Sequence, residues 1–188
     1  MSRRVLITGG ATGIGRVIAN SFVSLGDRIA ICDKSLEHIK NLKLEMPKSL
    51  IFKADVTQES QMKNLFEEVM DSFGGIDVLI SNAGISGPAG NIEDLKFEDW
   101  KSCLDVNLSG AFLTSRWAAK VMKEQASGLI LFISSTSGLF GVPMRSPYVT
   151  AKWGLIGLTK TLAMELGSHG IRVNAICPGS VEGDRMNN

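Results

Sequence analysis

The residue pair with the clearest chemical potential in this sequence is Tyr148 and Lys152, four positions apart in a segment with a helical pattern. On a helix, this spacing places both side chains on one face, one turn apart. A free phenol ionises at about pH 10, and a neighbouring cation favours its ionised form. Tyr148, the only tyrosine of the chain, is therefore a candidate acid and base. Most such pairs are ordinary surface residues, so the rest of the sequence must decide between the two interpretations.

The elements that must position this pair follow a regular alternation. Short, apolar, β-branched runs alternate with longer amphipathic segments, which is typical of βαβ units that form a parallel sheet. We predict a Rossmann-like, doubly wound parallel α/β fold in a single domain over residues 1–188, with ligands bound at the carboxyl ends of the strands. The predicted strands cover residues 5–8, 28–33, 50–54, 78–81, 129–134 and 172–175, and the predicted helices cover residues 13–25, 36–46, 58–73, 97–124 and 148–166.

Composition and charge argue against several classes of function. The chain has 188 residues and a net charge of +1 without a basic block, so neither nucleic acid nor a membrane is expected as a partner. No apolar run is long enough for a membrane span or a signal peptide. The three cysteines are widely separated and only two histidines are present, which favours reduced thiols, a cytoplasmic location and no metal site.

A glycine-rich turn follows the first predicted strand and opens the first predicted helix. Glycines let the backbone approach a pyrophosphate, and the free amides at a helix start stabilise its negative charge. Many strand-to-helix turns need glycine for geometry alone, so the motif is weak evidence without its context. The candidate phosphate-binding residues are Gly9, Thr12, Gly13, Ile14 and Gly15.

Asp33 supplies that context, since it ends the second predicted strand 18 residues past Gly15. A carboxylate at this place can accept hydrogen bonds from the adenosine ribose, and it repels a 2′-phosphate by roughly 1 to 4 kcal/mol at contact distance. NAD is therefore predicted in preference to NADP. Arg16 and Lys34 could instead receive a phosphate, although we expect both side chains to be solvated.

Polar or small residues also follow the third and fourth predicted strands. Asp55 and Val56 come after the third strand, and Asn82, Ala83 and Gly84 come after the fourth. Each set alone is compatible with an ordinary turn. Their positions at successive carboxyl ends of a parallel sheet indicate a shared cleft.

Asn107 lies inside the predicted helix over residues 97–124, where asparagine has a mediocre helix propensity. A buried amide that satisfies local backbone groups and a functional side chain are both compatible with this position.

Taken in order, these motifs resemble the short-chain dehydrogenase/reductase family over residues 5–181. In that family the tyrosine is the acid and base, so the resemblance implies this role for Tyr148. Lys152 would hold the nicotinamide ribose and favour the ionised phenol, and Ser135, thirteen residues before the tyrosine, would bind the substrate oxygen. The matching motifs are Thr8-Gly-x-x-x-Gly13-Ile14-Gly15, Asp55, Asn82-Ala83-Gly84, Asn107, Ser134-Ser135, Tyr148-x-x-x-Lys152 and Pro178-Gly179.

The resemblance also implies roles for the remaining matched residues. Asn107 would order a water that links Lys152 to solvent, and Asp55 and Val56 would contact the adenine. The other residues that would line the cofactor cleft are Asn82, Ala83, Gly84, Pro178, Gly179 and Val181.

Two departures from the family pattern affect these expectations. A threonine that binds the nicotinamide carboxamide usually follows Pro-Gly, whereas this sequence has Gly183, which leaves the backbone of Val181 for that contact. The sequence also ends at Asn188, before the C-terminal helix and last strand that the family places over the substrate.

The leading prediction is an NAD-dependent short-chain alcohol dehydrogenase or carbonyl reductase that acts on a small-molecule secondary alcohol or carbonyl. The alternatives are a truncated dinucleotide-binding protein without turnover and an NADP-linked carbonyl reductase. An apolar stretch before Tyr148 could line the substrate pocket, although packing of the loop is the commoner use of such residues. It contains Leu139, Phe140, Val142, Pro143 and Met144.

The predicted helices around residues 100–117 and 148–166 carry more apolar residues than one buried face requires. Members of the family often pair such helices across a two-fold axis, so a homodimer or homotetramer is expected. The residues concerned include Trp117, Trp153, Leu155, Ile156 and Leu158.

Overall fold

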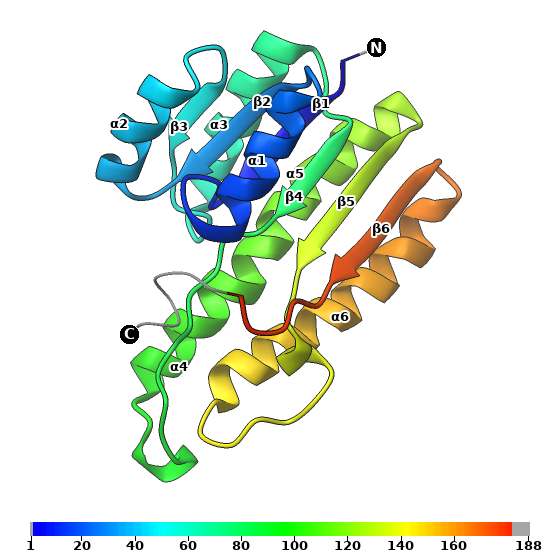
Figure 1. Cartoon of the computed structure of the whole chain (residues 1–188). Helices are drawn as coiled ribbons and strands as arrows, with labels where there is room; N and C mark the ends of the chain where they lie inside the picture. Colours follow the sequence, from blue (N-terminus) through cyan, green and yellow to red (C-terminus); the bar gives the residue numbers. More distant parts are fainter. Residues whose placement is uncertain (1, 182–188) are drawn as a thin grey trace.

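Six parallel strands form one sheet in the computed structural model, which describes residues 2–181 (Figure 1). The spatial order is β3-β2-β1-β4-β5-β6, so the direction of winding reverses between β1 and β4. In open α/β sheets a ligand binds at such a reversal, outside the carboxyl ends of the strands. The strands are β1 (Arg4–Thr8), β2 (Arg28–Asp33), β3 (Leu50–Lys53), β4 (Val78–Ser81), β5 (Gly128–Ile133) and β6 (Ile171–Ile176).

Helices cover both faces of this sheet (Figure 1). The apolar side chains of α1 and α2 pack on one face, and those of α3, α5 and α6 pack on the other. This arrangement confirms the predicted Rossmann-like fold. The helices are α1 (Gly13–Ser24), α2 (Leu36–Glu45), α3 (Glu59–Phe73), α4 (Phe97–Leu104), α5 (Gly110–Gln125) and α6 (Ser146–Gly167), with short 3₁₀ turns η1 (Ile92–Asp94) and η3 (Thr136–Gly138).

The sequence patterns explain these elements directly. Strands of a parallel sheet are buried on both sides, and β4 is accordingly buried at every position. Helix α3 buries Met62, Leu65, Phe66 and Val69, which recur every three to four residues and form one apolar stripe. The alternation of the two patterns therefore predicted the order of strands and helices.

The predicted helix over residues 97–124 is helical throughout, but a π-helical turn, η2 (Asp105–Ser109), lies between α4 and α5. A π turn has one residue more than an α turn, so it rotates the side chains that follow. Apolar residues recur at helical spacing on each side of the turn, so the sequence predicted a helix here without revealing the change of phase. Asn107 lies at the centre of this turn.

The register of the sheet brings the strand ends to one level. Thr8 pairs with Cys32 on β2 and with Ser81 on β4, and Ser81 pairs with Phe132 on β5. The residues that follow these strands therefore emerge side by side at the carboxyl edge of the sheet.

Several apolar residues assigned to a subunit interface instead belong to the core. Leu155 is buried, and Trp117 and Leu158 pack against the same core cluster. Three other apolar side chains on α5 and α6 are exposed, namely Phe112 (48%), Trp153 (51%) and Met164 (85%). Within residues 2–181, no helix is both long and apolar enough to cross a membrane.

Candidate active site

Tyr148 and Lys152 lie on consecutive turns at the start of α6. The chain enters this helix through Met144, whose φ of 61° is left-handed, and Pro147 occupies the first turn, where its fixed φ suits a helix start. The Lys152 Nζ atom lies 5.5 Å from the centroid of the Tyr148 ring. The two groups therefore share one face of the helix, as the spacing predicted.

Lys152 is held in place against the end of β5. Its side chain is only 5% exposed, and Nζ donates a hydrogen bond to the Ile133 carbonyl at 2.9 Å. The Ser134 hydroxyl donates to the Lys152 carbonyl at 3.1 Å. A buried ammonium is tolerated only when such partners replace water, so its position is tightly fixed.

The two serines after β5 have different environments. Ser134 is buried and its hydroxyl bonds the backbone of α6. Ser135 is partly exposed, and its Oγ accepts a hydrogen bond from the Ser137 amide at 3.1 Å as the cap of η3. Ser135 is therefore the serine of the two whose hydroxyl does not bond the backbone of α6, and its role as the substrate-binding serine stays a prediction.

Asn107 holds the segment after β4. Its side chain is 1% exposed; Oδ1 accepts from the Ile85 amide at 3.2 Å, and Nδ2 donates to the Ile85 carbonyl at 3.0 Å. Nδ2 also donates to the carbonyl of Cys103 at 2.9 Å and contacts its sulfur at 3.4 Å. The first of the two sequence interpretations, a buried amide that satisfies backbone groups, is thus observed.

The glycine-rich turn brings the backbones after β1 and β4 into contact. Gly9 has a φ of +60°, and a Cβ built on it would lie 2.8 Å from the Cα of Ala83. A Cβ on Gly15 would lie 2.4 Å from the Gly9 carbonyl oxygen. Thr12 precedes α1 without a side-chain capping bond, so the first amides of this helix depend on other partners. These features fit a pyrophosphate at the helix start.

Thr8 begins the matched glycine motif, but the sequence assigned no role to its side chain. Its Oγ1 accepts hydrogen bonds from the amides of Asn82 and Ala83, both at 3.1 Å. The Asn82 amide group donates in turn to the carbonyls of Thr8 at 3.1 Å and Gly9 at 2.8 Å. The sequence feature that could have indicated this role is a hydroxyl side chain at the last position of a buried strand.

Asp33 lies where the ribose-binding carboxylate was predicted. One carboxylate oxygen accepts from the Ala11 amide at 3.4 Å and the other from the Ser35 amide at 3.1 Å, which leaves each oxygen able to accept another bond. Arg16 forms an ion pair with Glu45 and its side chain is 17% exposed, so the expectation that it is solvated was wrong. Lys34 is exposed, as expected.

Asp55 and Val56 have structural partners. Asp55 Oδ1 accepts from the amide and the hydroxyl of Thr57, at 3.0 and 2.8 Å, and so forms a turn. Val56 is buried, and a Cβ built on Gly110 would lie 2.6 Å from its methyl carbon.

The segment after β6 returns toward the end of β5. The Pro178 carbonyl accepts a hydrogen bond from the Thr136 amide at 2.9 Å, whereas Gly179 and Val181 are exposed. Gly183, which replaces the expected threonine, lies outside the described residues.

The apolar stretch before α6 is exposed, which contradicts the expectation that it packs into its own loop. Leu139 is 45% exposed, Phe140 66%, Val142 41% and Met144 55%, and Pro143 is also exposed. The loop that they form leads directly into Tyr148.

Two buried thiols lie close to the site. Burial raises the pKa of the Cys32 thiol, at the end of β2, to about 12, and burial also raises the pKa of Cys103. Between residues 2 and 181, no three histidine, cysteine or acidic side chains are grouped as metal ligands.

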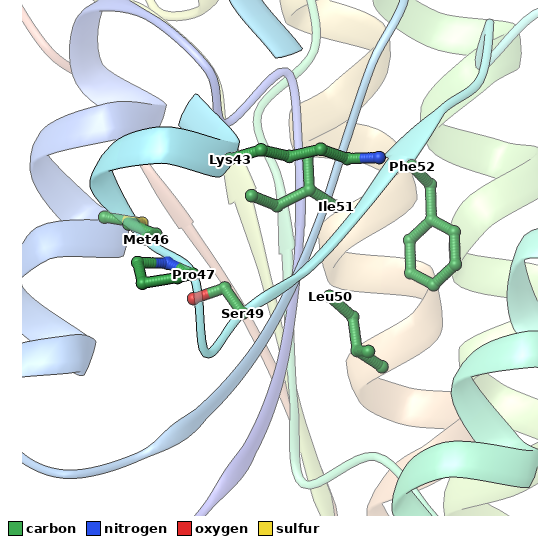
Figure 2. Close-up of a pocket in the computed structure, with 7 residues that line it drawn as sticks. All are labelled: Lys43, Met46, Pro47, Ser49, Leu50, Ile51 and Phe52. Atoms are coloured by element: carbon green, nitrogen blue, oxygen red, sulfur yellow. The ribbon is translucent and has the colours of Figure 1, made fainter. Parts of the chain in front are cut away.

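A shallow hollow at the edge of the sheet is separate from this site. Figure 2 shows that α2, β3 and the turn between them line it. Strand β3 is an edge strand, separated from β4 and β5 by β2 and β1. The lining residues are Lys43, Met46, Pro47, Ser49, Leu50, Ile51 and Phe52.

Comparisons with known proteins agree with this fold. A family model described as short chain dehydrogenase matches residues 3–188. An uncharacterized oxidoreductase of Thermotoga maritima is 40% identical over 187 residues, which cover 97% of this chain and 73% of the relative. An NAD⁺-bound xylitol dehydrogenase structure superposes with a TM-score of 0.94 at 31% identity, covering 98% of this chain and 72% of the other. The structure of ElxO with NADP bound superposes with a TM-score of 0.94 at 32% identity, covering 100% of this chain and 77% of the other.

The chain belongs to the short-chain dehydrogenase/reductase family, which confirms the resemblance seen in the sequence. The family comprises oxidoreductases that use nicotinamide cofactors, and similar structures hold NAD⁺ in one case and NADP in another.

Proposed function

We propose that this protein is an NAD-dependent oxidoreductase that transfers a hydride between the nicotinamide and a secondary alcohol or carbonyl substrate, with Tyr148 as the acid and base. The observation that carries the proposal is the pairing of Tyr148 with a buried, fixed Lys152 at the carboxyl end of β5. Ser135 follows the same strand two residues past Ile133, the carbonyl partner of Lys152.

The residues around the strand ends fit a dinucleotide. The Gly9 to Gly15 turn and the start of α1 would hold the pyrophosphate, and Asp33 would hold the adenosine ribose. Asp55 and the Val56 backbone would contact the adenine, while Asn82, Ala83, Gly84, Pro178, Gly179 and Val181 would line the cleft. When bound, the nicotinamide supplies the hydride acceptor or donor.

The side chains of this chain supply the proton chemistry. Tyr148 removes the proton of the substrate hydroxyl during oxidation and returns it during reduction, because hydride loss from a carbinol requires the proton to leave as well. Lys152 favours the ionised phenol through its charge. Ser135 donates a hydrogen bond to the substrate oxygen, and Asn107 holds the segment after β4 while ordering a water beside Lys152.

NAD is proposed rather than NADP because of the charges around the ribose site. Asp33 would repel a 2′-phosphate, and the guanidinium of Arg16 is already paired with Glu45. NADP use remains the competing function, supported by the similarity to NADP-bound ElxO. Asp33→Asn should improve the binding of NADP relative to NAD by about 10-fold, since roughly 1 to 4 kcal/mol of repulsion is at issue. An unaltered ratio in binding titrations would count against this role of Asp33.

The substitution Tyr148→Phe tests the catalytic role. It keeps the ring but removes the hydroxyl that would exchange a proton with the substrate. Turnover over a panel of alcohols and ketones should therefore fall by about 10²–10⁴-fold, while the affinity for NAD stays within a few-fold. Ile92→Ala, at an exposed position in η1, is the control. Tight NAD binding without turnover in the unmodified protein would instead favour a dinucleotide-binding protein.

The remaining proposals concern the setting of the reaction. One domain over residues 1–188 would carry both cofactor-binding and catalytic residues, and the substrate would be a small molecule next to the exposed apolar loop of residues 139–144. We place the protein in the cytoplasm because its three cysteines are free. The exposed Phe112, Trp153 and Met164 favour a homodimer or homotetramer, and a monomeric mass in light scattering would exclude both.

A further inference from the structure

A second cation lies beside the Tyr148 ring. The Cζ atom of Arg145 is 5.3 Å from the ring centroid, close to the 5.5 Å of the Lys152 Nζ atom. Arg145 is partly buried and directly precedes α6, where its carbonyl accepts a hydrogen bond from the Val149 amide at 2.9 Å. Its backbone is therefore fixed by the first turn of the helix.

The guanidinium of Arg145 is also tied to the segment that follows β4. Its Nη2 atom donates a hydrogen bond to the Ser86 carbonyl at 2.8 Å, in the segment after β4. The Gly90 amide donates to the Met144 carbonyl at 2.9 Å, so the two segments are linked at a second point. These bonds hold the charge near the ring rather than in solvent.

We propose that Arg145 is a positioning residue that acts with Lys152 on Tyr148, so that two fixed cations stabilise the ionised phenol. The proposal rests on the acid and base role of Tyr148 given above.

The other groups around the site do not offset this charge. Arg145 forms no ion pair with a carboxylate among residues 2–181. The other cation beside the Tyr148 ring is Lys152, and the Cys103 thiol of α4, whose pKa burial raises, interacts with both cations. Asn107, Ser135 and Ser86 are uncharged. Negative charge on a phenolate spreads into the ring, so a cation over the ring interacts with it as well as with the oxygen.

The size of the effect follows from Coulomb's law. A unit charge at the 5.3 Å that separates the Arg145 Cζ atom from the ring centroid, with an effective dielectric constant of about 40 to 80, shifts an ionisation by about 0.5 to 1 pH unit. This corresponds to a 3- to 10-fold change in the fraction of phenolate at a given pH.

The experiment is a titration of the tyrosinate absorbance band, which reports Tyr148 alone because the chain has no other tyrosine. Arg145→Gln removes the charge but keeps an amide donor for the Ser86 carbonyl, whereas Arg145→Lys keeps the charge. Arg172→Gln removes an exposed charge near the amino end of β6 and serves as the control. Far-ultraviolet circular dichroism verifies that each variant is folded.

We expect the tyrosinate band of Arg145→Gln to appear about 0.5 to 1 pH unit higher than in the unmodified protein, with Arg145→Lys and Arg172→Gln within 0.2 unit. Equal titrations of Arg145→Gln and Arg172→Gln would overturn the proposal. A shift in Arg145→Lys as large as that in Arg145→Gln would also overturn it, because the tether and not the charge would then be responsible.

The readout does not require turnover, so it separates this inference from the proposed function. If the protein turns over, the pH profile of kcat/KM for Arg145→Gln should move in the same direction by the same amount. A shifted tyrosinate band in a protein without turnover would sustain the electrostatic role of Arg145 and refute only the catalytic one.

Discussion

The side-chain amide of Asn107 should contribute substantially to the free energy of unfolding. It bonds the backbone of Ile85, which lies in the segment after β4 and belongs to no helix or strand. Asn107→Ala removes the acceptor for the Ile85 amide and the donor for the Ile85 carbonyl, at 3.2 and 3.0 Å. It also removes the donor for the Cys103 carbonyl at 2.9 Å. The two bonds to Ile85 join η2 to the segment after β4, and the bond to Cys103 joins η2 to α4. Gly84 and Lys152 lie next to these bonds.

The expected loss follows from these contacts. A buried polar group left without a partner costs about 1–3 kcal/mol, and two or three groups are affected. Ile85 is only partly buried, so water can replace some of the lost bonds. We therefore expect the free energy of unfolding to fall by about 2 to 4 kcal/mol.

Urea denaturation followed by circular dichroism measures this change. Asn174→Ala, at an exposed position on β6, is the matched control and should change stability by less than about 0.5 kcal/mol. Asn107→Leu keeps roughly the side-chain volume but loses the donors and the acceptor, so a loss as large as that of Asn107→Ala would assign the effect to hydrogen bonds rather than to a cavity. Equal stabilities of Asn107→Ala and Asn174→Ala would refute the reasoning.

Three further predictions concern other parts of the chain. Arg4 holds the pKa of Asp77 below its usual range through a 2.6 Å ion pair, so this stabilisation is complete above about pH 4 and is lost as the pH falls through the lower folded-state value. Asp77→Asn should therefore cost about 1 kcal/mol at pH 7, allowing for solvent exposure, and progressively less in urea titrations as the pH falls through the folded-state value. Alkylation of the native protein should modify Cys177 first, because the other two cysteines are fully buried; peptide mass spectrometry that finds equal rates would contradict this. Gly15→Ala places a Cβ 2.4 Å from a carbonyl oxygen of its own turn and should weaken NAD binding at least 10-fold by calorimetry, whereas Gly157→Ala, in open space on α6, should not alter it.

The sequence by itself determined the order of strands and helices and the residues at the strand ends. Apolar periodicity is a local property, and it separates a buried parallel strand from an amphipathic helix within a few residues. The pairing of Tyr148 with Lys152 was predictable for the same reason, since a helix fixes the direction of side chains four positions apart. The same local reasoning missed the π turn at Asn107, because helical spacing of apolar residues on each side of the turn does not reveal the one added residue between them.

The tertiary structure decided how side chains pair across long distances in the sequence. Arg16 bonds Glu45 and Thr8 bonds the Asn82 amide, and neither partner is recognisable from spacing. The placement of Arg145 between Ser86 and the Tyr148 ring has the same origin. Such pairs depend on strand order and register, which bring distant segments to one edge of the sheet and so decide which donors and charges surround the phenol.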